Sequence, residues 1–270
     1  MKYQVVVPSY QRAEICRDQT LATLERLKTD KDKIHVFVAN EEQEELYRSV
    51  LGDSYRLVVG VRGISSQRKF YHSWFPENEP LISIDDDMSE LLELGDNKLI
   101  PTEYSLDEIA EMGFGTAKAE GARLWGINPT MNHFFLKNHI SVGLRYICAN
   151  FMGSYAGDWI FTDPNRRMTN TGEDHHSTLR GFTRYGAVVR LEYLCPKTKY
   201  FAKGGIDACV VEDGQTRAQR HAEELSWVQS RYSDISSIQI KAGGVVNLRL
   251  KPITFNKIPR NNARSKQVSI

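Results

Sequence analysis

Four short apolar runs, separated by segments of helical character, occupy the first third of this 270-residue chain. The runs are residues 5–7, 34–39, 56–59 and 81–84. Apolar runs of this length that alternate with helices are typical of buried parallel strands, because a parallel sheet has helices on its faces. We therefore expect an α/β fold with a Rossmann-like central sheet and helices on both faces, an architecture typical of nucleotide-binding proteins.

The helices of this region have recognisable ends. Asn40 is a favourable N-cap for an acidic helix over residues 41–50, and Gly52 is placed to end it. A further helix is expected to include residues 67–74.

The rest of the chain is less regular. A capping box at residues 105–108 predicts a helix to about residue 120, and residues 216–231 predict an amphipathic helix. Residues 152–183 are expected to be rich in loops. Strands are expected at residues 124–127, 141–149, 188–193 and 245–250. We predict one domain over residues 1–240 with an elaborated C-terminal half, and a basic strand and tail over residues 241–270 that pack on or extend it.

Composition excludes several classes of protein. Hydrophobic residues make up 41% and charged residues 26%, as in ordinary globular proteins. No apolar run approaches the roughly 20 residues that a bilayer span needs, so no membrane association is expected. The cysteines are widely scattered, which predicts reduced thiols in a cytoplasmic protein rather than disulfides or a zinc site. They are Cys16, Cys148, Cys195 and Cys209.

Charge is distributed unevenly along the chain. The net charge is +1, but residues 241–270 carry seven cations and no acid. Such a segment suits an acidic partner such as nucleic acid, a nucleotide or a membrane surface, or it is a solvated tail that keeps the protein soluble.

Three consecutive carboxylates, Asp85, Asp86 and Asp87, directly follow the fourth apolar run. In open α/β sheets ligands bind at the carboxyl ends of the strands, and adjacent carboxylates repel one another unless a cation neutralises them. We therefore predict a Mg²⁺ or Mn²⁺ site that bridges a diphosphate. The alternative is a solvated acidic loop in which Asp87 or Ser89 caps a helix over residues 88–92.

Residues 62–69 lie between the third and fourth runs and combine a glycine, two serines and three cations. At the start of a helix these groups would cradle a phosphate, with Arg62, Gln67 and Arg68 as candidates. A serine-capped surface helix with solvated cations is the alternative.

The first run ends in Pro8, Ser9, Tyr10 and Arg12, which would lie at the same sheet edge. Tyr10 is suited to stack on a base and Arg12 to contact a phosphate. A strand-ending turn, for which proline is a natural breaker, is the alternative.

Together these motifs resemble the GT-A glycosyltransferases of the family-2 type, which use nucleotide-sugars. The shared features are Pro-Ser-Tyr-x-Arg after the first strand, Gly-x-x-x-x-Arg at residues 63–68, and the aspartate triplet. The resemblance implies that Asp87 binds the metal and that Asp85 helps to hold the nucleoside. We place Asp85 in the metal site as well, and Asp86 in the nucleotide-sugar site.

The same family often has a Glu-Asp pair further along the chain, in which the Asp is the general base. Glu173 and Asp174 form such a pair, so the resemblance implies that Asp174 is the base, with Glu173 in reserve. In an inverting transfer this carboxylate would deprotonate the acceptor hydroxyl. Alternatively, the pair caps a short helix. His175 and His176 would contact metal or diphosphate, or be ordinary loop histidines.

A narrower resemblance covers most of the chain. The TET-associated glycosyltransferases of bacteriophages are similar in layout and in short motifs at residues 125–129, 172–174 and 203–206, and in a helix from residue 217 before a basic tail. The resemblance implies an acceptor of double-stranded DNA with hydroxymethylated pyrimidines, and the host cytoplasm as location. Candidate acceptor or DNA contacts are Trp125, Lys203, Lys251, Lys257 and Arg260.

The sequence thus predicts a metal-dependent glycosyltransferase that moves a sugar, with a UDP-sugar as favoured donor, to 5-hydroxymethylpyrimidine in phage DNA. A polysaccharide, lipid, protein or small-molecule acceptor is the alternative. A sugar nucleotidyltransferase would require a glycine-rich loop after the first strand, which residues 8–10 lack. A DNA-binding module with a degenerate nucleotide site leaves the intact acidic motifs unexplained. The sugar, the stereochemistry and the oligomeric state do not follow from the sequence, and no protein partner is inferred.

Overall fold

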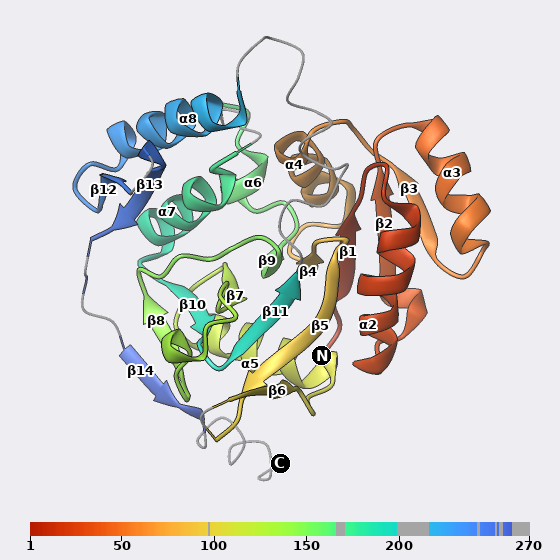
Figure 1. Ribbon diagram of the computed structural model, residues 1–270, viewed down its shortest axis with the longest axis horizontal. Coiled ribbons are helices and arrows are strands. Elements are labelled where there is room, and N and C mark those ends of the chain that lie inside the picture. Colours follow the sequence, from red (N-terminus) through yellow and green to blue (C-terminus); the bar gives the residue numbers. More distant parts are fainter. Residues whose placement is uncertain are drawn as a thin grey trace.

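A nine-stranded mixed sheet is the largest element of the protein (Figure 1). In spatial order its strands are β14 (Asn256–Pro259), β8 (His139–Gly143), β10 (Val188–Leu191), β7 (Trp125–Ile127), β9 (Phe151–Tyr155), β4 (Pro80–Ile84), β1 (Gln4–Pro8), β2 (Ile34–Val38) and β3 (Arg56–Val59). The computed structural model describes residues 1–96, 98–165, 171–198, 216–241, 244–251, 253 and 256–260.

The first four strands pair in parallel, as their spacing predicts. β1 lies between β2 and β4, and β3 pairs with β2. The second half of the sheet is mixed, because β9 runs antiparallel to both β4 and β7, and β8 runs antiparallel to β10 and β14. The basic C-terminal segment therefore contributes an edge strand to the main sheet. The domain boundary at residue 240 stays a prediction.

The helices are α1 (Ala13–Ile15), α2 (Ala22–Arg26), α3 (Glu41–Leu51), α4 (Ile64–Trp74), α5 (Leu106–Ala119), α6 (Trp159–Thr162), α7 (Glu173–Tyr185) and α8 (Arg217–Arg231), with a π-helical turn at Cys16–Leu21 and 3-10 turns at Lys31–Lys33 and His133–Phe135. Two predicted caps are confirmed. The Asn40 side chain accepts from the Gln43 amide, and Ser105 forms a capping box with Glu108. Thr216 forms a further capping box, which was not predicted from the sequence. Among the described helices, none is long and apolar enough to cross a bilayer.

Helices cover both faces of the sheet, which confirms the predicted α/β class. One hydrophobic cluster packs Val5 of β1 with Leu24 of α2 and Ile109 of α5. On the other face, Val6 of the same strand packs with Tyr71 of α4. Successive residues of a strand point to opposite faces, so a fully apolar strand such as β1 is buried on both sides.

Two smaller sheets complete the fold. One has the order β11 (Leu194–Thr198), β5 (Met88–Leu94) and β6 (Leu99–Pro101), and the other pairs β12 (Ser236–Ile240) with β13 (Val246–Leu250). The residues after the aspartate triplet are therefore a strand, and the alternative of a helix over residues 88–92 is wrong. These residues form a strand because they pair with β11, which lies more than 100 residues further along the chain and is invisible to a local pattern.

Two further expectations need correction. The strand predicted at residues 141–149 ends at Gly143, after which the chain forms a loop. The described part of residues 152–183 contains more regular secondary structure than expected, since it includes most of β9, α6 and nearly all of α7. The sequence pattern did not reveal α7, because many of its buried residues are polar: Glu173, His176, Ser177, Thr178 and Arg180.

Trp125 is fully buried, which contradicts its predicted contact with an acceptor or DNA. Its indole fills the space above two glycines, where a Cβ at Gly113 would approach the ring to 2.4 Å and one at Gly153 would collide with it. Trp125 is therefore a core residue that allows α5 and β9 to approach closely.

Candidate active site

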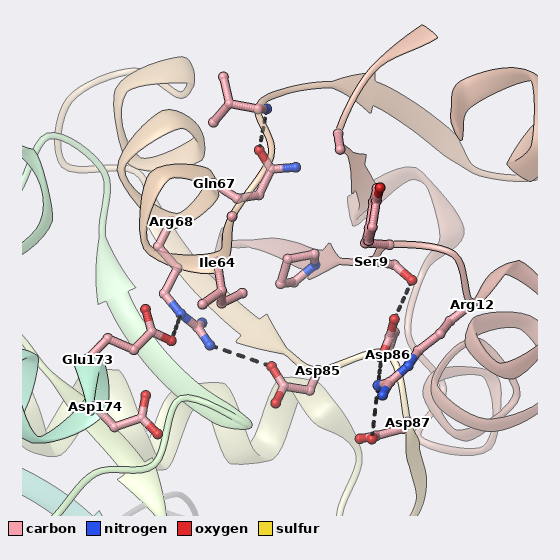
Figure 2. Close-up of a pocket in the computed structure, with 15 residues that line it drawn as sticks. Ser9, Arg12, Ile64, Gln67, Arg68, Asp85, Asp86, Asp87, Glu173 and Asp174 are labelled. Atoms are coloured by element: carbon pink, nitrogen blue, oxygen red, sulfur yellow. Dashed lines mark hydrogen bonds and ion pairs between the residues drawn. The ribbon is translucent and has the colours of Figure 1, made fainter. Parts of the chain in front are cut away.

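A pocket lies at the carboxyl ends of β1, β2 and β4, between the N-termini of α4 and α7 (Figure 2). It is lined by Pro8, Ser9, Tyr10, Arg12, Ala39, Val61, Gly63, Ile64, Gln67, Arg68, Asp85, Asp86, Asp87, Glu173 and Asp174. The four motifs that the sequence singled out thus meet in one place. β1 and β4 are adjacent and parallel, so the residues that follow them are neighbours.

One side of the pocket is a closed hydrogen-bond network. Ser9 donates to the Asp86 carboxylate and accepts from the Tyr47 hydroxyl, and that hydroxyl accepts from the Arg12 amide at 3.1 Å. The Arg12 guanidinium lies 3.2 Å from Asp86 and 3.4 Å from Asp87. Burial raises the pKa of Asp86 to about 6, although its bonds to Ser9 and Arg12 favour the charged form. Asp86 therefore anchors the loop after β1, and its place in the nucleotide-sugar site stays a prediction.

The opposite side is organised by Arg68, which is buried. Its Nε donates to Glu173 at 2.8 Å, and another nitrogen of the guanidinium lies 3.5 Å from Asp85 (Figure 2). Glu173 also accepts from the Ser65 hydroxyl at 3.1 Å. Burial acts to lower the pKa of Arg68, but Glu173 and the neighbouring acids outweigh it and raise that pKa. Arg68 thus joins α4, α7 and the aspartate triplet.

Asp174 differs from the other acids because one of its oxygens has no partner. Its Oδ2 accepts from the Tyr146 hydroxyl at 3.2 Å and lies 3.5 Å from the Cys148 sulfur. Its Oδ1 is buried without a hydrogen-bond partner among the described residues. Burial, with a further contribution from Glu173, raises the pKa of Asp174 to about 6. A carboxylate with an unpartnered buried oxygen and such a pKa is suited to accept a proton from a ligand.

The acidic triplet suits a divalent cation. The described lining of the pocket holds five carboxylates but only two guanidinium groups, which leaves an excess of negative charge. Burial raises the pKa of Asp85 to about 8, and Asp87 and Asp86 add to that effect. The Asp85 side chain is 37% exposed and faces the pocket. Hard oxygen donors in an acidic pocket fit Mg²⁺ or Mn²⁺.

This site would be completed by a ligand rather than by protein. Within the described ranges, no group of three or more His, Cys, Asp or Glu side chains is arranged to hold a metal ion. Asp87 and Asp85 would supply carboxylate oxygens, and diphosphate oxygens and water the rest. Mg²⁺ is commonly bound by one or two carboxylates together with substrate phosphates.

The residues predicted to contact nucleotide or phosphate have different environments. Pro8 and Tyr10 line the pocket, whereas Arg62 is exposed and stacks 5.9 Å from the Tyr10 ring. Gln67 lines the pocket but its amide bonds to the backbone of Val61 and Val38. It therefore fixes the ends of β2 and β3 instead of offering its amide to a phosphate.

The predicted acceptor residues are scattered. Arg260 binds Glu93 at 2.6 Å and the Leu94 carbonyl at 2.9 Å, so it joins the end of β14 to β5, and its role as an acceptor contact stays a prediction. Lys251 and Lys257 are exposed and line neighbouring hollows of the surface. Lys203, Cys209 and the rest of the basic tail beyond residue 260 lie outside the described residues; the other three cysteines are free thiols.

Several residues of the site were not predicted from the sequence. Tyr47 of α3 and Tyr146 of the loop after β8 are isolated tyrosines, with no local pattern to indicate contacts across the fold. Thr20 donates to the Asp85 carbonyl at 2.7 Å and accepts from the Met88 amide, which fixes the turn of the triplet. Of the two histidines, His175 stacks on Tyr146 and the buried His176 packs against Trp227.

No protein-family model matches the sequence, and no curated protein matches it. Solved structures do match: the chain has the GT-A fold of nucleotide-sugar glycosyltransferases. One is glucosyl-3-phosphoglycerate synthase from Mycobacterium tuberculosis in complex with phosphoglyceric acid, at 13% identity and a TM-score of 0.52 over 97% of this chain and 91% of that chain. Another is a mannosyltransferase from Pyrobaculum calidifontis in complex with GDP-Man and Mn²⁺, at 12% identity and a TM-score of 0.51 over 86% and 64%. At such identities the likeness shows the fold alone.

Proposed function

We propose that this protein is a metal-dependent glycosyltransferase that moves a sugar from a nucleotide-diphosphate donor to an acceptor hydroxyl. The observation that carries the proposal is the pairing, in one pocket, of the aspartate triplet with Asp174, a carboxylate that has an unpartnered oxygen. The mannosyltransferase of the same fold was crystallised with GDP-Man and Mn²⁺, which supports this type of donor and metal.

In this proposal the donor lies along the carboxyl ends of β1 and β4. Tyr10 and Pro8 contact the base, Arg12 and Arg68 offset the charge of the pocket, and Asp87 and Asp85 hold Mn²⁺ or Mg²⁺. When bound, the cation would stabilise the negative charge of the departing diphosphate. A UDP-sugar is the favoured donor, on the resemblance noted from the sequence.

Asp174 acts as the general base. The acceptor hydroxyl gives its proton to Asp174 while its oxygen bonds to the anomeric carbon, and the bond from that carbon to the diphosphate oxygen breaks. Glu173 is a positioning residue, because its two oxygens accept from Arg68 and Ser65. Tyr146 donates to Asp174 and orients it for the acceptor.

For the acceptor we propose 5-hydroxymethylpyrimidine in double-stranded DNA. The motif resemblance to phage enzymes and the seven cations of residues 241–270 support it. A base in a duplex must leave the stack to reach the pocket, as it does for other enzymes that modify bases.

The test is a transfer assay with a panel of nucleotide-sugars, Mn²⁺ or Mg²⁺, and duplexes that carry 5-hydroxymethylcytosine or 5-hydroxymethyluracil. We expect a sugar-sized mass gain on the nucleoside that EDTA, Asp87→Asn and Asp174→Asn each abolish. Asp53→Asn is the matched control, because the Asp53 side chain is 93% exposed. Donor hydrolysis without DNA modification would refute the acceptor, and no turnover of any donor would refute the enzyme.

A further inference from the structure

Two hollows beside the pocket together form a strongly basic groove. Arg145 and Arg190 line both hollows, which therefore adjoin. The first hollow adds Arg249 and Lys251 of the β13 region, and the second adds Lys137 and Lys257. We call these six cations the basic groove.

Little negative charge offsets these cations among the described lining residues. The single carboxylate is Glu192, 3.5 Å from Arg145 and 2.8 Å from Arg190. It is buried and holds these two arginines in place. Cations thus outnumber carboxylates six to one in the described lining of the groove, and such a surface attracts phosphate groups.

The groove reaches the proposed base through one side chain. Tyr146 lines the first hollow and donates to Asp174 at 3.2 Å, and His175 of the same hollow stacks on the Tyr146 ring at 4.3 Å. A molecule held in the groove would therefore lie one side chain away from Asp174.

Two exposed aromatic residues, consecutive in the chain, lie at the second hollow or directly before it in sequence. Phe134 is 71% exposed and Phe135 is 64% exposed, and Phe135 lines the second hollow together with Lys257. Cations along a groove with aromatic rings beside them are typical of nucleic-acid binding, where the cations follow the backbone and the rings stack on bases. A membrane surface is flat, so it would reach the exposed rings but not the cations of a concave groove. A single phosphate group would occupy only one of the two hollows and would leave the other cations without an anion.

We propose that the basic groove holds the sugar–phosphate backbone of a nucleic-acid acceptor, with Phe134 and Phe135 stacking on bases exposed beside it. This inference rests on the proposed function for the identity of the acceptor, but it assigns that acceptor to residues near β8, β10 and β13. Arg145, Arg190 and the two phenylalanines were not among the residues that the sequence indicated, whereas Arg249 belongs to the basic segment of residues 241–270.

The test is fluorescence anisotropy of the full chain with a labelled duplex of unmodified bases, so that binding is measured without turnover. Arg249→Ala/Lys257→Ala removes two exposed cations of the groove, and Lys2→Ala/Lys118→Ala removes two exposed cations elsewhere. We expect the groove variant to lower the slope of log affinity against log salt by about 2, and the control to leave it unchanged. Thermal unfolding checks that both variants are folded.

Several outcomes would overturn the inference. One is that the slope of log affinity against log salt is the same for the groove variant and the wild type. Another is that the wild-type protein hydrolyses a donor but does not bind the duplex. Binding to phosphatidylserine vesicles that requires Phe134 and Phe135, without duplex binding, would assign the surface to a membrane instead. Groove-dependent duplex binding by a protein that turns over no donor would support the groove and refute only the glycosyltransferase.

Discussion

The two sides of the pocket use similar residues in opposite ways. On the side of Ser9, Arg12 and Asp86, each carboxylate is engaged by a neighbour, and the network ties the loop after β1 to α3 and β4. On the side of α7, Asp174 keeps one oxygen unpartnered while Glu173 beside it is fully engaged. The acids whose oxygens are hydrogen-bonded therefore build the pocket, whereas the acid with an unpartnered oxygen is available for chemistry.

The largest effect is expected where the unpartnered oxygen is removed. Asp174→Asn should lower kcat by about 10²–10⁴-fold, because an amide cannot accept the proton of the hydroxyl. The same variant should unfold at a higher temperature at pH 8, because it no longer buries a carboxylate that burial destabilises. Steady-state kinetics and thermal unfolding measure the two effects. If the variant lost stability as well as activity, the role of Asp174 would be structural and not catalytic.

Loss of the buried ion pairs of Arg68 should lower the stability of the protein. Arg68→Met leaves Glu173 and Asp85 without their buried cation, and we expect a loss of about 3–5 kcal/mol in the free energy of unfolding. Arg48→Met is the control, since Arg48 pairs with Glu44 at the surface and should change stability by less than about 1 kcal/mol. Urea titration measures the free energy of unfolding of both variants. Equal losses would show that the buried ion pairs of Arg68 stabilise the protein no more than a surface pair does.

A smaller loss is expected in the Ser9 network. Ser9→Ala leaves the buried Asp86 without its hydroxyl donor, which should cost about 1–3 kcal/mol of stability. Ser73→Ala is the control, because the Ser73 hydroxyl is exposed and bonds only to the Lys69 carbonyl of its own helix. Destabilisation by both variants alike would show that the network adds nothing beyond an ordinary hydroxyl contact.

The smallest effect is the pH dependence of the wild type. A base must be deprotonated, so kcat/KM should rise with pH through the pKa of Asp174, about 6, and should be about tenfold lower one unit below it. Because this folded-state pKa is above the unfolded value of about 3.9, the same group should lower stability as pH rises from about 4 to 6. A pH–rate profile without this limb would assign the proton transfer to another group.

The sequence predicted much of the pocket because its motifs follow strands. Four apolar runs indicated a parallel arrangement, and parallel neighbours bring Arg12 and Asp86 together across 74 residues of chain. The capping residues were also readable, since Asn40 and Ser105 act on the backbone within three residues. Local rules therefore sufficed for these elements.

Other features depended on partners distant in the chain. Trp125 looked like a possible acceptor contact until two glycines from α5 and β9 placed its ring in the core. Arg260 looked like part of a basic tail, but Glu93 on β5 fixes it. In both cases the sequence shows the residue type, but the neighbour that determines the role of the side chain lies far away along the chain.

The sequence alone determined the α/β class, the position of the acidic triplet at a sheet edge, and the residue types that a metal and a base require. Tertiary structure decided which acids are engaged and which one keeps an unpartnered oxygen, and it gathered the basic groove from β10, β14, the β13 region and the segments on either side of β8. The physical reason is that periodicity and capping act over a few residues, whereas hydrogen-bond satisfaction and burial depend on contacts between residues far apart in the chain.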